Sequence, residues 1–121
     1  MKISAQPGAP TRPERGWSAL VPRRPRRASV HRLLMQEGYQ LAFWLPAFRE
    51  PCLPAQYHYR DATGTEVIWL AGPDPVLREQ DPSTPAHRSR FWVYANRRDP
   101  RRADEIRERL RRAWGVLWKP T

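Results

Sequence analysis

The sequence predicts an α+β domain: a small antiparallel sheet of three to four strands, with a short N-terminal helix and a C-terminal amphipathic helix packed on one face. Three observations lead to this prediction. Short apolar or alternating runs separated by turn residues are typical of antiparallel strands. Apolar residues at three- and four-residue steps near the C-terminus indicate a helix with one buried side. A proline-rich start of different composition indicates an Arg/Pro-rich arm that precedes the domain.

Residues 1–27 form this predicted arm. Its five prolines remove backbone donors and oppose helices, so we expect the arm to be disordered or extended. Only Trp17, Leu20 and Val21 in it could dock on a core. Residues 1–32 carry eight basic side chains and one acidic one, a net of +7, and the rest of the chain carries +3. Such arms usually bind polyanions; the alternative, an organellar transit peptide, needs an amphipathic helix that the prolines oppose.

The predicted single domain, residues 28–121, begins with a short helix. Ser29 is placed to cap a helix that runs from Val30 to Glu37, and Gly38 would stop it. Four strand candidates follow along the chain; they are residues 39–45, 56–60, 65–70 and 90–95. Turn residues between the second and third candidates predict a hairpin, and prolines mark the other connections as loops.

The C-terminal helix has the clearest pattern. Asp99 is predicted to cap it, and Pro100 suits its first turn. Gly115 would weaken the helix and Pro120 would end it. The apolar residues that recur at helical spacing are Ala103, Ile106, Leu110, Ala113 and Leu117.

Basic residues outnumber acidic residues by 22 to 12, which gives a formal net charge of +10. All but two of them are arginines, whose planar guanidinium suits phosphate and stacks on aromatic rings, although a GC-rich genome would also favour arginine. The single cysteine, Cys52, excludes an internal disulfide and a cysteine-based zinc site, so we expect a cytoplasmic protein. No long apolar run and no cofactor motif is present, so we expect neither a membrane partner nor a cofactor.

The strand candidates are rich in aromatic residues, and a single helix cannot cover both faces of a four-stranded sheet. We therefore expect exposed rings, which suit single-stranded nucleic acid when arginines flank them. The alternative is that the arm, a loop or the second copy of a homodimer covers this face. Arginines at the start of the C-terminal helix could also contact phosphate together with the helix amides. The predicted nucleic-acid-binding residues are Arg23, Arg24, Arg26, Arg27, Arg97, Arg98, Arg101, Arg102, Arg107, Arg111, Trp92 and Tyr94.

His58 and Arg60 are weaker candidates for a catalytic site. They share one strand face, and a metal-independent RNase needs a proton-transfer group and a cation for the developing phosphorane charge. A lone histidine on a strand is more often structural or exposed. The other histidines have no metal-ligand spacing to each other or to Cys52, so no metal site is predicted.

Three hypotheses for the function follow. The favoured one is a small nucleic-acid-binding accessory protein, of a kind that phages and mobile elements encode, whose arm gives salt-dependent affinity for RNA or DNA. The second is a protein-binding inhibitor or assembly module, because the same charge would steer docking on an acidic protein surface. The third is a small RNase that uses His58 and Arg60.

Overall fold

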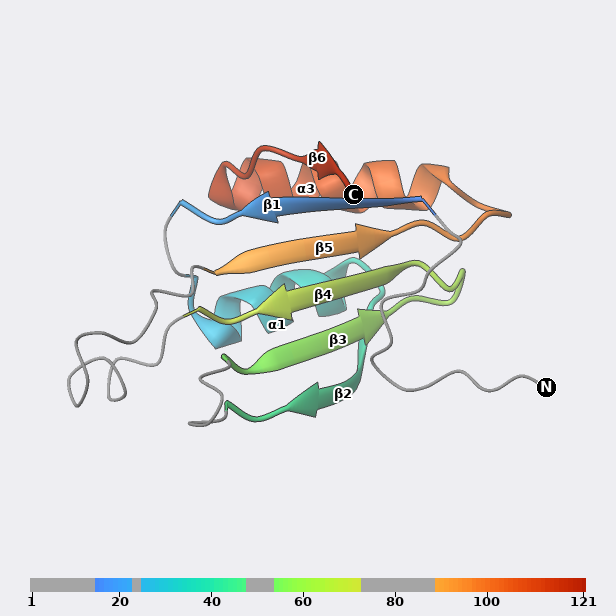
Figure 1. The fold of residues 1–121 in the computed structure, drawn as a ribbon. Helices are drawn as coiled ribbons and strands as arrows, with labels where there is room; N and C mark the ends of the chain where they lie inside the picture. The colour runs from blue at the N-terminus through green and yellow to red at the C-terminus, as the bar shows by residue number, and fades with distance from the viewer. Residues whose placement is uncertain (1–14, 23–24, 48–53, 73–88) are drawn as a thin grey trace, which may run out of the picture.

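The computed structural model describes residues 15–22, 25–47, 54–72 and 89–121 (Figure 1). Within them the chain forms one antiparallel sheet in the strand order β2-β3-β4-β5-β1-β6. Helices α1 (Arg27–Gln36) and α3 (Arg101–Trp114) both lie behind this sheet in Figure 1. The strands are β1 (Gly16–Leu20), β2 (Gln40–Leu45), β3 (Gln56–Arg60), β4 (Glu66–Leu70), β5 (Arg90–Tyr94) and β6 (Lys119–Pro120).

The α+β class predicted from the sequence is confirmed, but the sheet has six strands where three to four were predicted. The two missed strands are β1 and β6. Strand β6 is only two residues long and ends in Pro120, and a proline is tolerated there because β6 lies at the sheet edge.

Strand β1 corrects the predicted boundary of the arm. Residues 16–20 pair with β5 on one side and with β6 on the other, so this part of the proline-rich segment belongs to the sheet. Of the three residues predicted to dock, Trp17 and Val21 are buried, whereas Leu20 is 42% exposed. The stretch between Pro13 and Pro22 is long enough for one alternating strand. Its backbone N–H groups pair with β5, which the flanking prolines could not do because they lack an N–H group. The rest of the predicted arm, residues 1–14 and 23–24, lies outside the described residues.

Helix α1 begins three residues earlier than predicted. Arg26 occupies the N-cap position and makes no side-chain capping bond, so Ser29 lies inside the first turn instead of capping the helix. Gly38 ends the helix as expected, with a φ of 90° that favours glycine. Val30 and Leu34 are fully buried and fix α1 on the sheet.

Helix α3 confirms the first three residues of the predicted apolar stripe, since Ala103, Ile106 and Leu110 are fully buried, whereas Ala113 in the last turn is exposed. Its ends differ from the prediction. Pro100 is the N-cap, whereas Asp99 pairs with Asn96 in an isolated bridge. The helix stops at Trp114 because Gly115 adopts a left-handed φ of 65°, so the periodicity beyond it does not continue the helix, and Leu117 is 78% exposed.

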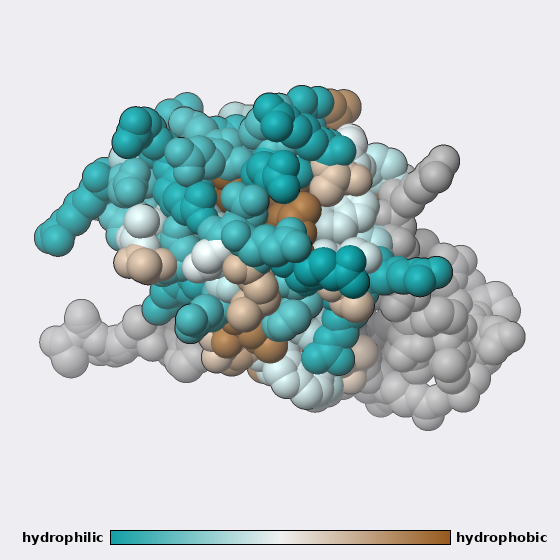
Figure 2. Space-filling view, turned by 180° about the vertical axis from the view of Figure 1, so that it is seen from behind, coloured by the Kyte–Doolittle hydropathy of each residue, from teal (hydrophilic) through white to brown (hydrophobic). Residues whose placement is uncertain are grey.

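The core lies between the helices and one face of the sheet. Alternate residues of the central strands, such as Val67, Phe91 and Val93, are fully buried against the helices. Seen from behind, the described part of the helix layer is mostly hydrophilic on its outer surface (Figure 2). The two helices therefore cover one face of the sheet, and no helix of the described residues lies on the other face.

Asp61, at the turn after β3, joins three parts of this architecture. One carboxylate oxygen accepts the backbone N–H groups of Thr63 and Thr65 and the Thr63 hydroxyl. The other accepts Arg102 Nε of α3 at 2.8 Å. Arg102 also donates to the carbonyl of Glu37, at the end of α1, so the carboxylate and the guanidinium together link the β3–β4 turn to both helices.

The environment of Asp61 favours its charged form. Burial alone would raise the pKa of this carboxyl, but hydrogen bonds from Thr63, Arg102 and the Thr65 N–H outweigh burial and hold the pKa below its usual value. The Asp61 side chain is only 4% exposed, so this pair is screened much less than the surface ion pairs of α3.

We expect Asp61→Asn to destabilise the fold by about 2–3 kcal/mol, because the substitution leaves Arg102 without a buried counter-ion. Urea unfolding followed by circular dichroism measures the change. The matched control is Glu105→Gln, which removes another carboxylate from the same guanidinium; Glu105 is 60% exposed, so this loss should be about 1 kcal/mol or less. Equal losses for the two variants would contradict the role given to Asp61.

The same carboxylate should make the stability of the fold depend on pH. Its pKa is lower in the folded chain than in the unfolded chain, so its stabilisation is complete above the unfolded pKa and disappears as the pH falls through the folded pKa. The difference in unfolding free energy between wild type and Asp61→Asn should therefore shrink as the pH falls below about 4, the ordinary pKa of an aspartate. Urea titrations across this range would show it, and a difference that stays constant would refute it.

Candidate nucleic-acid interface

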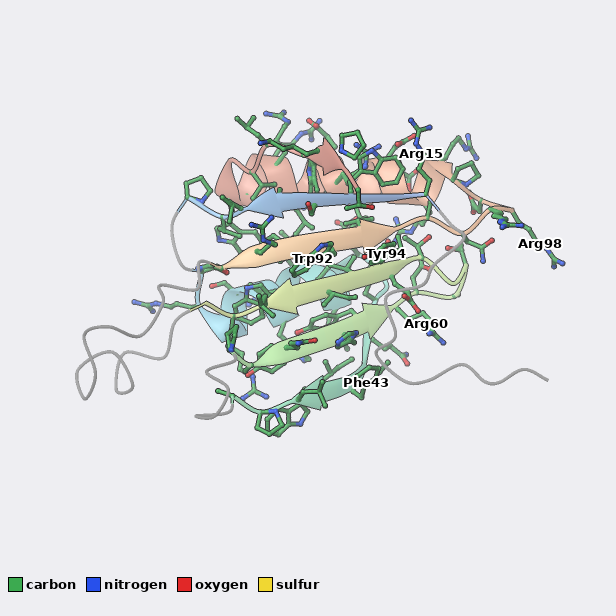
Figure 3. The ribbon with its side chains drawn as sticks, in the orientation of Figure 1. Arg15, Phe43, Arg60, Trp92, Tyr94 and Arg98 are labelled. Atoms are coloured by element: carbon green, nitrogen blue, oxygen red, sulfur yellow. The ribbon has the colours of Figure 1, made fainter. Side chains whose placement is uncertain are left out.

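The face of the sheet opposite the helices carries a row of residues that are direct cross-strand partners. The pairing register places these residues opposite one another from β2 to β6. Because directly opposed residues of antiparallel strands point to the same side, their side chains form one band across the sheet. The members in order are Phe43, His58, Ile68, Trp92, Ser18 and Lys119, and Figure 3 views the sheet from this side.

A β-bulge decides which ring of β2 reaches this face. Leu41 pairs with Tyr59 but Phe43 pairs with His58, so Ala42 is an extra residue in the ladder. Without that shift, Phe43 would share the helix side with Leu41. Such a bulge is set by local geometry that alternation alone does not reveal, and the sequence analysis therefore did not identify Phe43 as a residue of this face.

Two rings of the row are at least partly open to solvent, those of Phe43 and Trp92. Phe43 is 40% exposed and stacks on the His58 imidazole, with ring centroids 4.2 Å apart and planes 15° apart. Trp92 is half-buried, and the guanidinium of Arg90 lies over its ring at 5.6 Å. An arginine above an exposed indole can add a cation to a surface on which a planar ligand stacks.

Tyr94 lies in the next row, and a glycine gives its ring room. The Tyr94 ring lies over strand β1 at Gly16, which is the cross-strand partner of Tyr94. A Cβ atom at position 16 would stand 2.6 Å from Cε1 of the ring, so a larger residue would push the tyrosine aside. A glycine is therefore needed at position 16, because the Tyr94 ring packs directly against the backbone there. This packing holds Tyr94 beside Trp92 (Figure 3).

Basic side chains border the rings. Arg90 and Lys119 lie on the same face as Trp92, and Arg97 and Arg98 are exposed in the turn that follows β5, beyond the end of the sheet (Figure 3). Arg60 lies on this face too, but it donates to Glu66 at 2.6 Å, so part of its donor capacity is already used. Sequence analysis missed both residues: alternation along the predicted strand 90–95 already places Arg90 on the face of Trp92, whereas Lys119 reaches this face only through its pairing with Ser18 of β1.

The arginines of α3 are on the other side of the sheet, and most are engaged there. Arg107 pairs with Asp104 and stacks 3.9 Å from the centroid of the Trp17 ring. Arg111 binds Glu108 through two nitrogens, and these bonds, with those from a neighbouring arginine, lower the pKa of Glu108 to about 2. Together with Arg102, which holds Asp61, these side chains support the helix layer, so we leave them out of the interface.

The remaining predicted residues lie at the starts of the helices. Arg26 and Arg27 flank the first turn of α1, and the guanidinium of Arg27 lies 5.0 Å from the ring of Tyr57 on the helix side. Arg101 is exposed at the first position of α3. Arg23 and Arg24 lie outside the described residues.

His58 and Arg60 do share one face, as the sequence predicted. His58 is 8% exposed, and its Nε2 lies 3.2 Å from the amide oxygen of Gln56. Stacking on Phe43 and this hydrogen bond hold the imidazole of His58 in place within the row. The catalytic role of the two residues stays a prediction.

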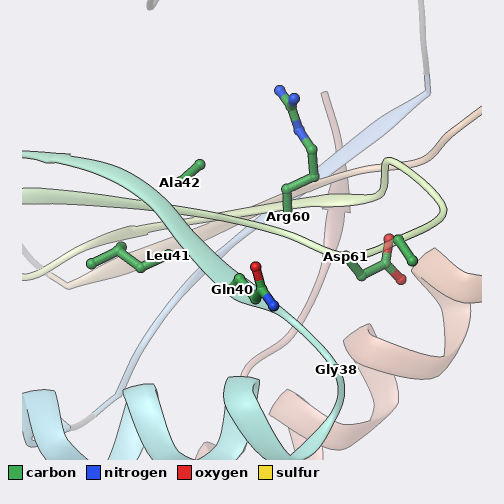
Figure 4. A pocket seen from close by; sticks show the side chains of 7 residues that line it. Gly38, Gln40, Leu41, Ala42, Arg60 and Asp61 are labelled. Carbon is green, nitrogen blue, oxygen red and sulfur yellow. The ribbon is translucent and has the colours of Figure 1, made fainter.

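A hollow of about 390 Å³ opens beside Arg60, where β2 begins (Figure 4). It does not bring a carboxylate and an arginine together, since Arg60 and Asp61 point to opposite sides of the chain. In the described ranges, no three His, Cys, Asp or Glu side chains are grouped to hold a metal ion. No helix in that part of the chain is both long and apolar enough to cross a membrane.

Comparison of the chain with protein-family models, with curated proteins and with solved structures finds no match. Function must therefore be argued from the chemistry of the face itself. That face combines flat aromatic rings with guanidinium and ammonium groups, which suits a planar, anionic ligand.

Proposed function

We propose that the protein binds single-stranded nucleic acid on the sheet face opposite its helices. The observation that carries the proposal is Trp92, a half-buried ring in the middle of this face with the Arg90 guanidinium over it. One base would stack on Trp92 and another on Phe43, and Arg90 and Lys119 would hold phosphates between or beside them. Stacking needs only the face of a base, so such a surface tolerates many sequences.

The shape of the surface favours single strands over duplexes. Duplex reading in the major groove uses an inserted helix or a two-stranded ribbon, whereas this face presents the broad side of a sheet. Rings on such a surface can reach only bases that are not already stacked within a duplex. An acidic protein could use the same cations and anchor on the same rings, so a pull-down with nuclease treatment separates the two partners: a complex that survives digestion points to protein.

We expect Trp92→Ala to weaken binding of a single-stranded oligonucleotide about tenfold or more, because stacking of one base contributes about 1–3 kcal/mol. Trp92→Phe keeps a ring at the same place and should retain most of the affinity. Fluorescence anisotropy with a labelled strand of roughly 12 nucleotides at fixed salt measures both variants. If the alanine variant binds as tightly as wild type, Trp92 does not carry the site.

The cations of the face should govern the salt dependence of binding. Each phosphate contact to a single strand contributes about 0.7 to the slope of log K against log salt, so Arg90→Gln should reduce that slope by about this amount. Arg111→Gln is the matched control, since it removes the same formal charge from the helix side, where Glu108 already neutralises it. An Arg111→Gln slope that falls as far as that of Arg90→Gln would show that net charge, and not the face, binds the strand.

A further inference from the structure

The two edges of the sheet differ in how they are protected against pairing with another chain. Strand β6 is two residues long, and its residues are a lysine and a proline, which both discourage a further strand. Strand β2, at the opposite edge, has six residues and no charge or proline. Its large side chains Phe43, Trp44 and Leu45 are 40%, 50% and 39% exposed. A long, apolar edge of this kind is a template for a strand from another chain.

On the helix side of the sheet, β2 is the open end of an aromatic row. Trp44 is paired with Tyr57, which is paired with Trp69, and Phe91 of β5 follows. The first two neighbours are stacked, with centroids 6.2 Å and 5.1 Å apart. The inner rings of Tyr57, Trp69 and Phe91 are buried, whereas the terminal ring of Trp44 at the sheet edge is half exposed.

We propose that a second copy of this chain pairs antiparallel along β2, with the two-fold axis at Trp44. This register sets Trp44 opposite the partner's Trp44, so the aromatic row continues into the second sheet. It also sets Phe43 beside the partner's Leu45 on the opposite face, so apolar side chains meet on both sides of the strand. A two-fold contact is self-complementary and closes at the dimer.

Charge favours this edge for a contact between copies. The chain carries a net charge of +10, so most of its surface repels a second copy. Strand β2 has no charged residue, and the nearest arginine on β3, Arg60, is already paired with Glu66. Two copies can therefore meet along β2 without placing like charges directly opposite each other.

The pairing would join the two faces proposed for nucleic acid into one surface. Directly opposed residues point to the same side, so both copies would present their Trp92 rings on one side of a continuous sheet. The inference does not rest on the proposed function, since Trp44 lies on the helix side, away from Trp92. A failure of nucleic-acid binding would leave the dimer standing, and the reverse also holds.

The test is the mass of the full chain in solution, measured by sedimentation equilibrium over a range of protein concentrations. We expect wild type to reach twice the 14.3 kDa of one chain. Trp44→Lys and Leu45→Lys, which put charge on opposite sides of the same strand, should both sediment as monomers. Leu117→Lys is the matched control, because Leu117 is 78% exposed away from this edge, and it should dimerise like wild type.

Hydrogen exchange of the wild-type chain gives a second measurement that no substitution can disturb. Amides of β2 should exchange more slowly as the concentration rises through the dimerisation range, whereas the Lys119 amide of β6 should not change. A wild type that stays monomeric, edge variants that still dimerise, or masses above the dimer would each overturn the proposal. Circular dichroism of each variant confirms that its fold is intact before the masses are compared.

Discussion

The ion pair between Asp61 and Arg102 links the β3–β4 turn to both helices, whose buried apolar residues pack on one face of the sheet. The carboxylate closes the β3–β4 turn, and the guanidinium reaches the end of α1 from the first turn of α3. The Arg102 side chain also lies over the ring of Tyr39, whose burial raises its pKa. Both helices are thereby held on one side of the sheet. Because both helices lie on one face of the six-stranded sheet, the other face is left for contact with solvent or with a binding partner.

The pairing register of the strands determines which side chains lie on that other face. The extra residue at Ala42 turns Phe43 towards His58 and Trp92, and turns Trp44 towards Tyr57. Phe43 and Trp44 are consecutive and therefore lie on opposite faces, and the bulge decides which of the two rings joins the stacking surface. A one-residue slip would exchange the two rings, because alternate residues of a strand point to opposite faces.

Sequence patterns predicted the parts of this fold that local chemistry determines. The helix around Ile106 and Leu110 follows from periodicity, and the hairpin around Asp61 follows from its turn residues. Strand β1 could not be predicted because its neighbours in sequence are prolines, and its partners β5 and β6 are more than 60 residues away. Trp92 and Tyr94 were found by alternation, which also places Arg90 on their face, whereas Lys119 joins them only through β1 and β6.

The position of β1 also changes what the basic charge of the first 32 residues can do. On the sequence alone, this charge belongs to one arm that precedes the domain. In the fold, Arg15 begins the segment of β1 and its guanidinium lies over Trp17, whereas Arg27 lies over Tyr57 at the start of α1. These two arginines stack on rings of the helix side, so their positive charge lies on the side of the sheet opposite the proposed interface. Among the described residues, Arg90 and Lys119 of the sheet lie on the face of Trp92, and we expect these two cations to contribute to the salt dependence.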